Sequence, residues 1–140
     1  MKKIITWIAA ILVILLVVCG IQLWRGGWIT SAQIERVEFR GCSSCEGPVS
    51  GSVELSRSEI NKMVTYYNLA GYAGRVTGED CDSAFGFTIY LKDGTWFSFR
   101  EAGSPRIEVN PLNGEKYWIT SGLLARYAQE LIEKYELTVS

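Results

Sequence analysis

The chain has 140 residues, with 14 basic and 15 acidic side chains, four cysteines and no histidine. The lack of histidine excludes Ser-His-Asp and Cys-His catalytic arrangements and every histidine-ligated metal. Three of the basic residues precede position 33, so residues 33–140 carry 11 basic against 15 acidic side chains, a net charge of −4. This acidic balance argues against nucleic acid or an anionic membrane face as a partner, and the length suffices for one compact domain.

An apolar segment without a charged residue occupies positions 4–24, directly after Lys2 and Lys3. A helix of this length spans roughly 30 Å, which is the thickness of the hydrocarbon core of a bilayer. Trp7 and Trp24 lie near its two ends, where indole rings favour the headgroup region. We therefore expect this segment to be a single membrane-spanning helix.

The positive charges around this segment predict its orientation. The α-amino group, Lys2 and Lys3 come before the span and only Arg25 follows it closely, so the N-terminus should stay in the cytoplasm. The expected organisation is a cytoplasmic tip and anchor at 1–24, a short linker at 25–32 and an extracytoplasmic domain at 33–140. The linker reaches at most about 26 Å, which holds the domain close to the cell membrane.

Two other interpretations of the segment compete with the anchor. A cleaved signal peptide would need a cut after Thr30-Ser31-Ala32, which lies far beyond the apolar core. A bacterial lipoprotein would carry its lipid on Cys19, because residues 16–20 read Leu-Val-Val-Cys-Gly, yet Val18 is larger than the residue that normally precedes this cysteine. The length of the apolar run and its flanking tryptophans favour the uncleaved anchor.

The first part of the domain predicts two strands and a helix. Residues 34–39 and residues 49–55 both alternate between apolar and polar side chains, which is typical of half-buried strands. Ser56 and Glu59 have the spacing of a capping box, which predicts a helix to about Leu69, with Gly71 as its stop. The residues from 72 to 83 are rich in glycine and predict no definite element.

A β-hairpin around Lys92-Asp93-Gly94 is the clearest local structure. A three-residue loop with Gly94 in the left-handed conformation places all the apolar side chains of both strands on one side, as a buried face requires. We therefore predict this loop rather than a two-residue Asp-Gly turn. The same register sets Tyr90 against Trp96 on the opposite face.

The last part predicts a second hairpin and a helix. Residues 106–109 and 116–119 should pair, and Thr120 or Ser121 should cap a final helix. The apolar stripe of that helix consists of Leu124, Tyr127, Ala128, Leu131 and Tyr135. The whole order predicts an α+β fold, with a mainly antiparallel sheet and two helices packed on one of its faces.

These features resemble small lipoprotein and membrane-anchored α+β domains of Gram-positive bacteria. The resemblance rests on Ile34-Glu35-Arg36-Val37, the capped helix, the Asp-Gly hairpin and Tyr117-Trp118-Ile119 before the last helix. It covers most of residues 34–135 and implies the same fold and a place in the bacterial envelope. Those domains are mostly of unknown function, and no catalytic motif carries over from them.

Cys42, Cys45 and Cys81 fall in predicted loops. In an extracytoplasmic domain we expect one disulfide, either Cys42–Cys45 or a bridge from one of these two to Cys81. A thiol-active pair would favour a helix N-terminus after its first cysteine, but Pro48 and a strand follow. Zinc on the three thiols would lack a second Cys-x-x-Cys, so we expect neither a metal nor another cofactor.

Tyr90, Trp96 and Trp118 exceed what the alternating core positions require. We expect some of them to face outward and to mark a binding surface, with packing under loops as the alternative. The leading hypothesis is a non-enzymatic module, tethered to the membrane by residues 4–24, that binds an envelope protein or other envelope component through its aromatic sheet face. The alternative is a thiol-active or metal-binding envelope protein that uses Cys42, Cys45 and Cys81.

Overall fold

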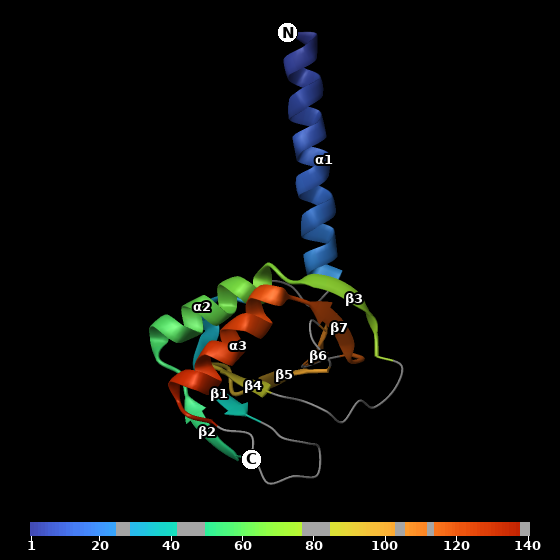
Figure 1. The fold of residues 1–140 in the computed structure, drawn as a ribbon. Helices are drawn as coiled ribbons and strands as arrows, with labels where there is room; N and C mark the ends of the chain where they lie inside the picture. The colour runs from blue at the N-terminus through green and yellow to red at the C-terminus, as the bar shows by residue number, and fades with distance from the viewer. Residues whose placement is uncertain (25–28, 42–49, 77–84, 103–105, 112–113, 138–140) are drawn as a thin grey trace.

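The computed structural model describes all of the chain except residues 25–28, 42–49, 77–84, 103–105, 112–113 and 138–140. A long helix, α1 (Lys2–Trp24), stands on a domain built from a seven-stranded sheet and two further helices in the described residues, α2 (Arg57–Asn68) and α3 (Gly122–Lys134) (Figure 1). A short 3-10 helix, Ser31–Gln33, leads into the sheet. The segment Lys2–Gly20 is long and apolar enough to cross a membrane, a property that signal sequences share.

The sheet is antiparallel at every pair of neighbouring strands, in the order β2-β1-β4-β5-β6-β7-β3. The strands are β1 (Ile34–Gly41), β2 (Ser50–Glu54), β3 (Gly71–Arg75), β4 (Phe85–Leu91), β5 (Trp96–Glu101), β6 (Arg106–Asn110) and β7 (Tyr117–Thr120). The predicted α+β class is therefore confirmed. The strand that the glycine-rich sequence did not predict is β3, which pairs with β7 at one edge of the sheet.

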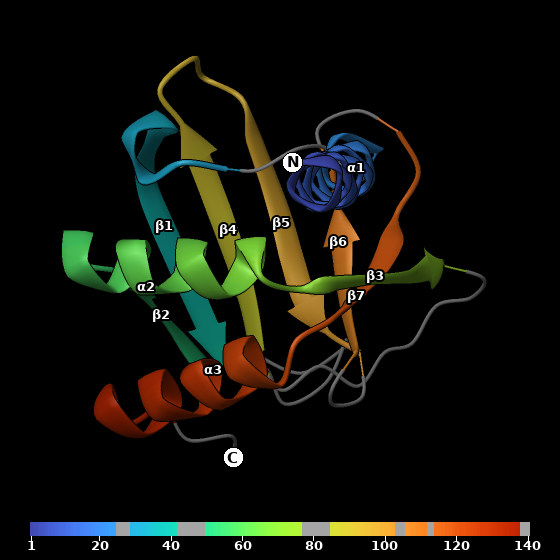
Figure 2. The ribbon, with the colours of Figure 1, turned by 90° about the horizontal axis from the view of Figure 1, so that it is seen from above.

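The core lies between one face of the sheet and the two helices of the domain. Phe39, Phe87 and Phe99 lie opposite one another on β1, β4 and β5, and all three are buried. From α2, the ring of Tyr67 stacks on Phe99 with the centroids 5.1 Å apart. Both helices lie across this same face of the strands (Figure 2). Their buried apolar residues are Ile60, Met63, Val64, Tyr67, Leu124, Tyr127, Ala128 and Leu131.

The predicted hairpin register is confirmed. The N–H of Leu91 donates to the carbonyl of Thr95 at 2.9 Å, and Tyr90 lies opposite Trp96. Gly94 has a φ of 88°, in the left-handed region that glycine reaches without steric cost. Asp93 stabilises the turn, because its carboxylate accepts the backbone N–H of Thr95 at 2.9 Å and also the Thr95 hydroxyl. These hydrogen bonds lower the pKa of Asp93.

Both helices of the domain begin at serine caps. Ser56 Oγ accepts the N–H of Glu59 at 3.4 Å, and the Glu59 carboxylate accepts the N–H of Ser56 at 2.8 Å, which confirms the capping box. Ser121 rather than Thr120 caps α3, since its Oγ accepts the N–H of Leu124 at 3.1 Å. The helix α2 ends at Asn68, and Gly71 begins β3 instead of serving as the stop.

Candidate functional site

The face of the sheet opposite α2 and α3 carries the other set of alternating side chains, and no helix in the described part of the chain covers it. We call it the open face. Strand register sets Arg36, Tyr90 and Trp96 side by side, and likewise Arg100, Glu108 and Trp118. Its principal side chains are Arg36, Glu38, Arg40, Thr88, Tyr90, Trp96, Ser98, Arg100, Glu108 and Trp118.

Trp96 is the exposed aromatic residue of the open face, with 52% of its surface accessible. It borders a hollow of about 420 Å³ between the hairpin turn and the end of β6, lined by Gly94, Thr95, Trp96, Asn110 and Pro111. None of these five described residues is charged. An indole beside an amide and a hydroxyl offers apolar contact area together with hydrogen-bonding groups, a combination found at protein interfaces.

Tyr90 lies beside Trp96 but is less available. The guanidinium of Arg36 lies 3.6 Å from the centroid of its ring, and its hydroxyl donates to Glu38 Oε2 at 3.3 Å. The ring is therefore covered on one side by a cation–π contact and held in place at its polar end. Tyr90 is therefore a fixed neighbour of Trp96, and its ring is less available than the indole for contact with a partner.

Glu38 organises the charges of this part of the open face. Arg40 Nη2 lies 3.0 Å from Glu38 Oε1, and Arg36 Nη1 lies 3.9 Å from Glu38 Oε2. Burial raises the pKa of Glu38, but hydrogen bonds from Arg40, Ser52 and Tyr90 outweigh that effect and lower it. The carboxylate thus stays ionised at neutral pH and holds two arginines over the face.

Trp118 does not extend the exposed aromatic surface. Its side chain is only 9% accessible, and the guanidinium of Arg106 lies 5.6 Å from the ring centroid. Its cross-strand neighbour Glu108 is buried as well and pairs with Arg100 Nε at 3.4 Å and Lys116 Nζ at 3.3 Å. Of the three aromatic residues expected at a binding surface, the structure brings Tyr90 and Trp96 together and leaves Trp118 apart from them.

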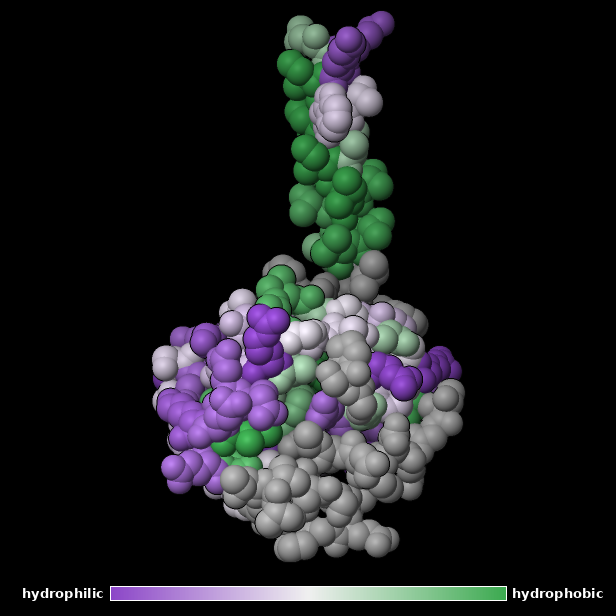
Figure 3. Space-filling model, viewed as in Figure 1, coloured by the Kyte–Doolittle hydropathy of each residue, from purple (hydrophilic) through white to green (hydrophobic). Residues whose placement is uncertain are grey.

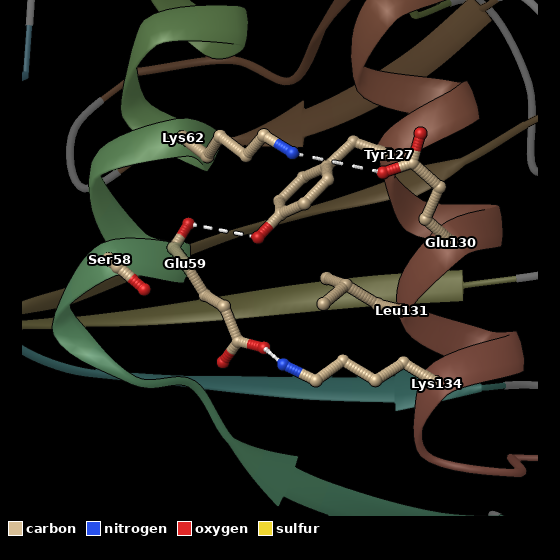
Figure 4. A pocket seen from close by; sticks show the side chains of 7 residues that line it. All are labelled: Ser58, Glu59, Lys62, Tyr127, Glu130, Leu131 and Lys134. Atoms are coloured by element: carbon tan, nitrogen blue, oxygen red, sulfur yellow. Dashed lines mark hydrogen bonds and ion pairs between the residues drawn. The ribbon is translucent and has the colours of Figure 1, made fainter.

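A second hollow, of about 310 Å³, lies between α2 and α3 (Figure 4). The carboxylate of Glu59 points to Lys134 across it, with Oε1 and Nζ 2.6 Å apart, and Tyr135 donates to the two carboxylate oxygens at 2.8 and 2.9 Å. Burial raises the pKa of Glu59, but the hydrogen bonds from Lys134, Ser56 and Tyr135 prevail and lower it to about 2. A carboxylate so fully engaged links the helices and is unsuited to proton transfer near neutral pH.

Sequence reasoning missed this role of Glu59 beyond its cap. The capping box was visible at the spacing Ser56 to Glu59, but Lys134 and Tyr135 lie 75 and 76 positions further along the chain. Local periodicity instead pairs Lys134 with Glu130 on its own helix. In the structure Glu130 Oε2 lies 3.9 Å from Nζ of Lys62 on α2. Glu130 and Lys134, both on α3, therefore each pair with an oppositely charged residue of α2.

The thiol candidates Cys42, Cys45 and Cys81 lie outside the described residues, so the expected disulfide and the thiol-active alternative stay predictions. Cys19 lies in α1 with a free thiol. Across the described ranges, no group of three His, Cys, Asp or Glu side chains gathers in a way that could hold a metal ion.

Comparison of this chain with models of protein families, with curated proteins and with solved structures found no match in any of the three.

Proposed function

We propose that the chain is a membrane-tethered module outside the cytoplasm, which binds a protein of the cell envelope through Trp96 and the open face around it. The observation that carries this proposal is the half-exposed indole of Trp96, which lies beside Tyr90 and borders a hollow whose described lining residues are uncharged. Tryptophan, tyrosine and arginine are the residue types that most often dominate the energy of protein interfaces.

The surroundings of Trp96 favour a protein partner. The hollow next to the indole accommodates an apolar side chain, and the Asn110 amide and Thr95 hydroxyl at its edge offer hydrogen bonds. Arg36 and Arg40, each 42% accessible, are held in place by Glu38. Guanidinium groups that are already positioned lose little conformational entropy when they bind acidic or carbonyl groups of a partner.

A binding role rather than catalysis also agrees with the titrating groups. The shifted carboxylates in the described part of the chain, Glu38, Glu59 and Asp93, all have a lowered pKa. A general acid or base needs a pKa nearer to the working pH. The tether is α1, and the two lysines at its start favour an orientation with the N-terminus in the cytoplasm and the domain outside.

The test is photo-crosslinking in living cells. A photoreactive phenylalanine analogue at position 96 should give a discrete protein adduct, and the same analogue at Glu133, which is exposed on α3, should not give that adduct. In addition, Trp96→Ala should reduce co-purification of the captured protein at least tenfold while leaving the melting temperature unchanged. Identical adducts at 96 and 133, or none at 96, would contradict the proposal.

A further inference from the structure

Asn68, the last residue of α2, holds the linker that follows α1. Its Oδ1 accepts the N–H of Ile29 at 3.2 Å, and its Nδ2 donates to the carbonyl of Ile29 at 2.8 Å. Because α1 ends at Trp24, four residues separate its end from this clamp, and Ile29 is the fifth residue after it. Five residues span at most about 18 Å, so the C-terminal end of α2 must lie close to the end of the membrane-spanning helix.

The linker then continues along α2. Arg57, in the first turn of the helix, donates from Nη1 to the carbonyls of Ser31 at 3.0 Å and Ile34 at 3.1 Å. Contacts at both ends of α2 therefore hold the chain against one side of this helix. Figure 2 shows the short 3-10 helix and the start of β1 beside α2, with α1 close to the other end.

Two exposed leucines lie at the corner next to the clamp. Leu69 is 68% accessible and Leu123 is 47% accessible. Gly71 pairs with Thr120 in the antiparallel β3–β7 ladder, so Leu69, two residues before Gly71, and Leu123, three residues after Thr120, leave the sheet at the same end. Figure 1 places the C-terminal end of α2 near the foot of α1 and the N-terminal end of α3 on the same side of the domain, although Figure 2 shows α3 across α2 from α1. Figure 3 shows hydrophobic surface next to the foot of α1.

The side of α2 that meets the linker carries no acidic group. Asn61, Thr65 and Leu69 are exposed and recur every four residues, which places them on one side of the helix together with Asn68. The domain as a whole has a net charge of −4, which an anionic lipid surface would repel. A helix side without acidic residues, with Arg57 at its start and leucine at its end, is the part of such a domain that can approach lipid headgroups without this penalty.

We infer that this corner rests on the lipid surface of the membrane that α1 crosses, with Leu69 and Leu123 inserted among the headgroups. The inference depends on the tether in the proposed function. It also orients the domain. Because α2 and α3 lie on the side of the sheet near α1, the open face is turned away from the bilayer (Figure 1), and Trp96 on this face is 52% accessible.

The experiment uses the full chain in vesicles of equal parts phosphatidylcholine and phosphatidylglycerol. A photoreactive amino acid is placed at 69, at 123 or, as the control, at Glu54, which is exposed on β2 and lies opposite Glu38 of the open face. After irradiation, the mass of the protein should show lipid adducts for positions 69 and 123, at least fivefold above the yield at position 54.

Each alternative outcome identifies what has failed. If the reconstituted chain retains residues 1–24 but gives no lipid adduct at 69 and 123, or gives equal yields at all three positions, the lipid contact is overturned while the tether stands. Adducts between two copies of the chain at 69 and 123, in place of lipid, would assign the leucines to self-association and overturn it too. If the intact mass lacks residues 1–24, the tether itself fails, and the lipid contact fails with it.

Discussion

Lys134 Nζ lies 2.6 Å from Glu59 Oε1, which joins the last residue of α3 to the first turn of α2. Glu59 also completes the capping box with Ser56. The same carboxylate therefore caps the N-terminus of α2 and binds Lys134 at the C-terminus of α3. The arrangement suits both helix dipoles, because a negative group stabilises an N-terminus and a positive group a C-terminus. The hydroxyl of Tyr127 donates to the backbone carbonyl of Glu59 at 3.2 Å and adds a further link between the two helices.

Glu59→Gln should destabilise the domain. The amide keeps the shape of the side chain but loses the charge-assisted hydrogen bonds from Lys134 and Tyr135, so we expect the free energy of unfolding to fall by about 1–3 kcal/mol. Urea unfolding followed by tryptophan fluorescence measures the change. Glu54→Gln, at an exposed position of β2, is the matched control and should shift stability by no more than about 0.5 kcal/mol. Equal stabilities of the two variants would refute the structural role of Glu59.

The contribution of Glu59 should depend on pH. Its pKa is about 2 in the folded chain, against 4.5 for an ordinary glutamate. The folded state thus binds this proton more weakly than the unfolded state, so acidification favours unfolding. The stability difference between the natural chain and Glu59→Gln should be constant above about pH 5, shrink as the pH falls below 4.5, and reach its minimum only below pH 2. A difference that stays constant over this range would contradict the assignment.

Gly94→Ala should weaken the hairpin. At a φ of 88°, a side chain at this position meets the steric penalty of the left-handed region, which costs about 1–2 kcal/mol. Gly122→Ala is the control, because Gly122 begins α3 without a positive φ and an added Cβ would meet nothing within 4 Å. Thermal unfolding should therefore show a lower melting temperature for the first variant and an equal or higher one for the second.

Asn68→Ala should release the linker from α2. The amide proton of Ile29 loses its acceptor, so its hydrogen exchange should accelerate at least tenfold, while amides in the middle of the sheet keep their protection. Asn61→Ala is the control on the same helix, since the side chain of Asn61 is exposed. Unchanged exchange at Ile29 would show that the clamp does not hold the linker in solution.

The intact mass of membrane-extracted protein, after alkylation of free thiols without reduction, tests the anchor and the cysteines together. We expect the full-length mass with one alkyl group outside the membrane span, which corresponds to an uncleaved α1 and one disulfide among Cys42, Cys45 and Cys81. A mass that begins at Cys19 with lipid attached would replace the anchor by a lipoprotein. Three alkyl groups outside the span would remove the disulfide and favour the thiol or metal alternative.

Much of the fold could be predicted because the signals for it are local. Alternation along β4 and β5 leaves one register that buries Phe87, Ile89, Phe97 and Phe99 together, and Gly94 supplies the only turn conformation that fits it. The caps at Ser56 and Ser121 follow from hydrogen bonds within four residues. The strand β3 could not be predicted, because its glycines interrupt the alternation of apolar and polar side chains. Its position in the sheet depends on its pairing with β7.

The candidate surfaces depended on contacts between residues far apart in the sequence. The sequence by itself determined the long apolar helix α1, the α+β class and the pairing of Tyr90 with Trp96 across two strands, since apolar length, periodicity and turn sterics act over short stretches of chain. Only the tertiary structure decided that Trp96 is exposed and Trp118 buried, and that Leu69 and Leu123 follow the same end of the β3–β7 pair. It also decided that Lys134 binds Glu59, because such contacts depend on how helices pack over the whole sheet and no local rule encodes that arrangement.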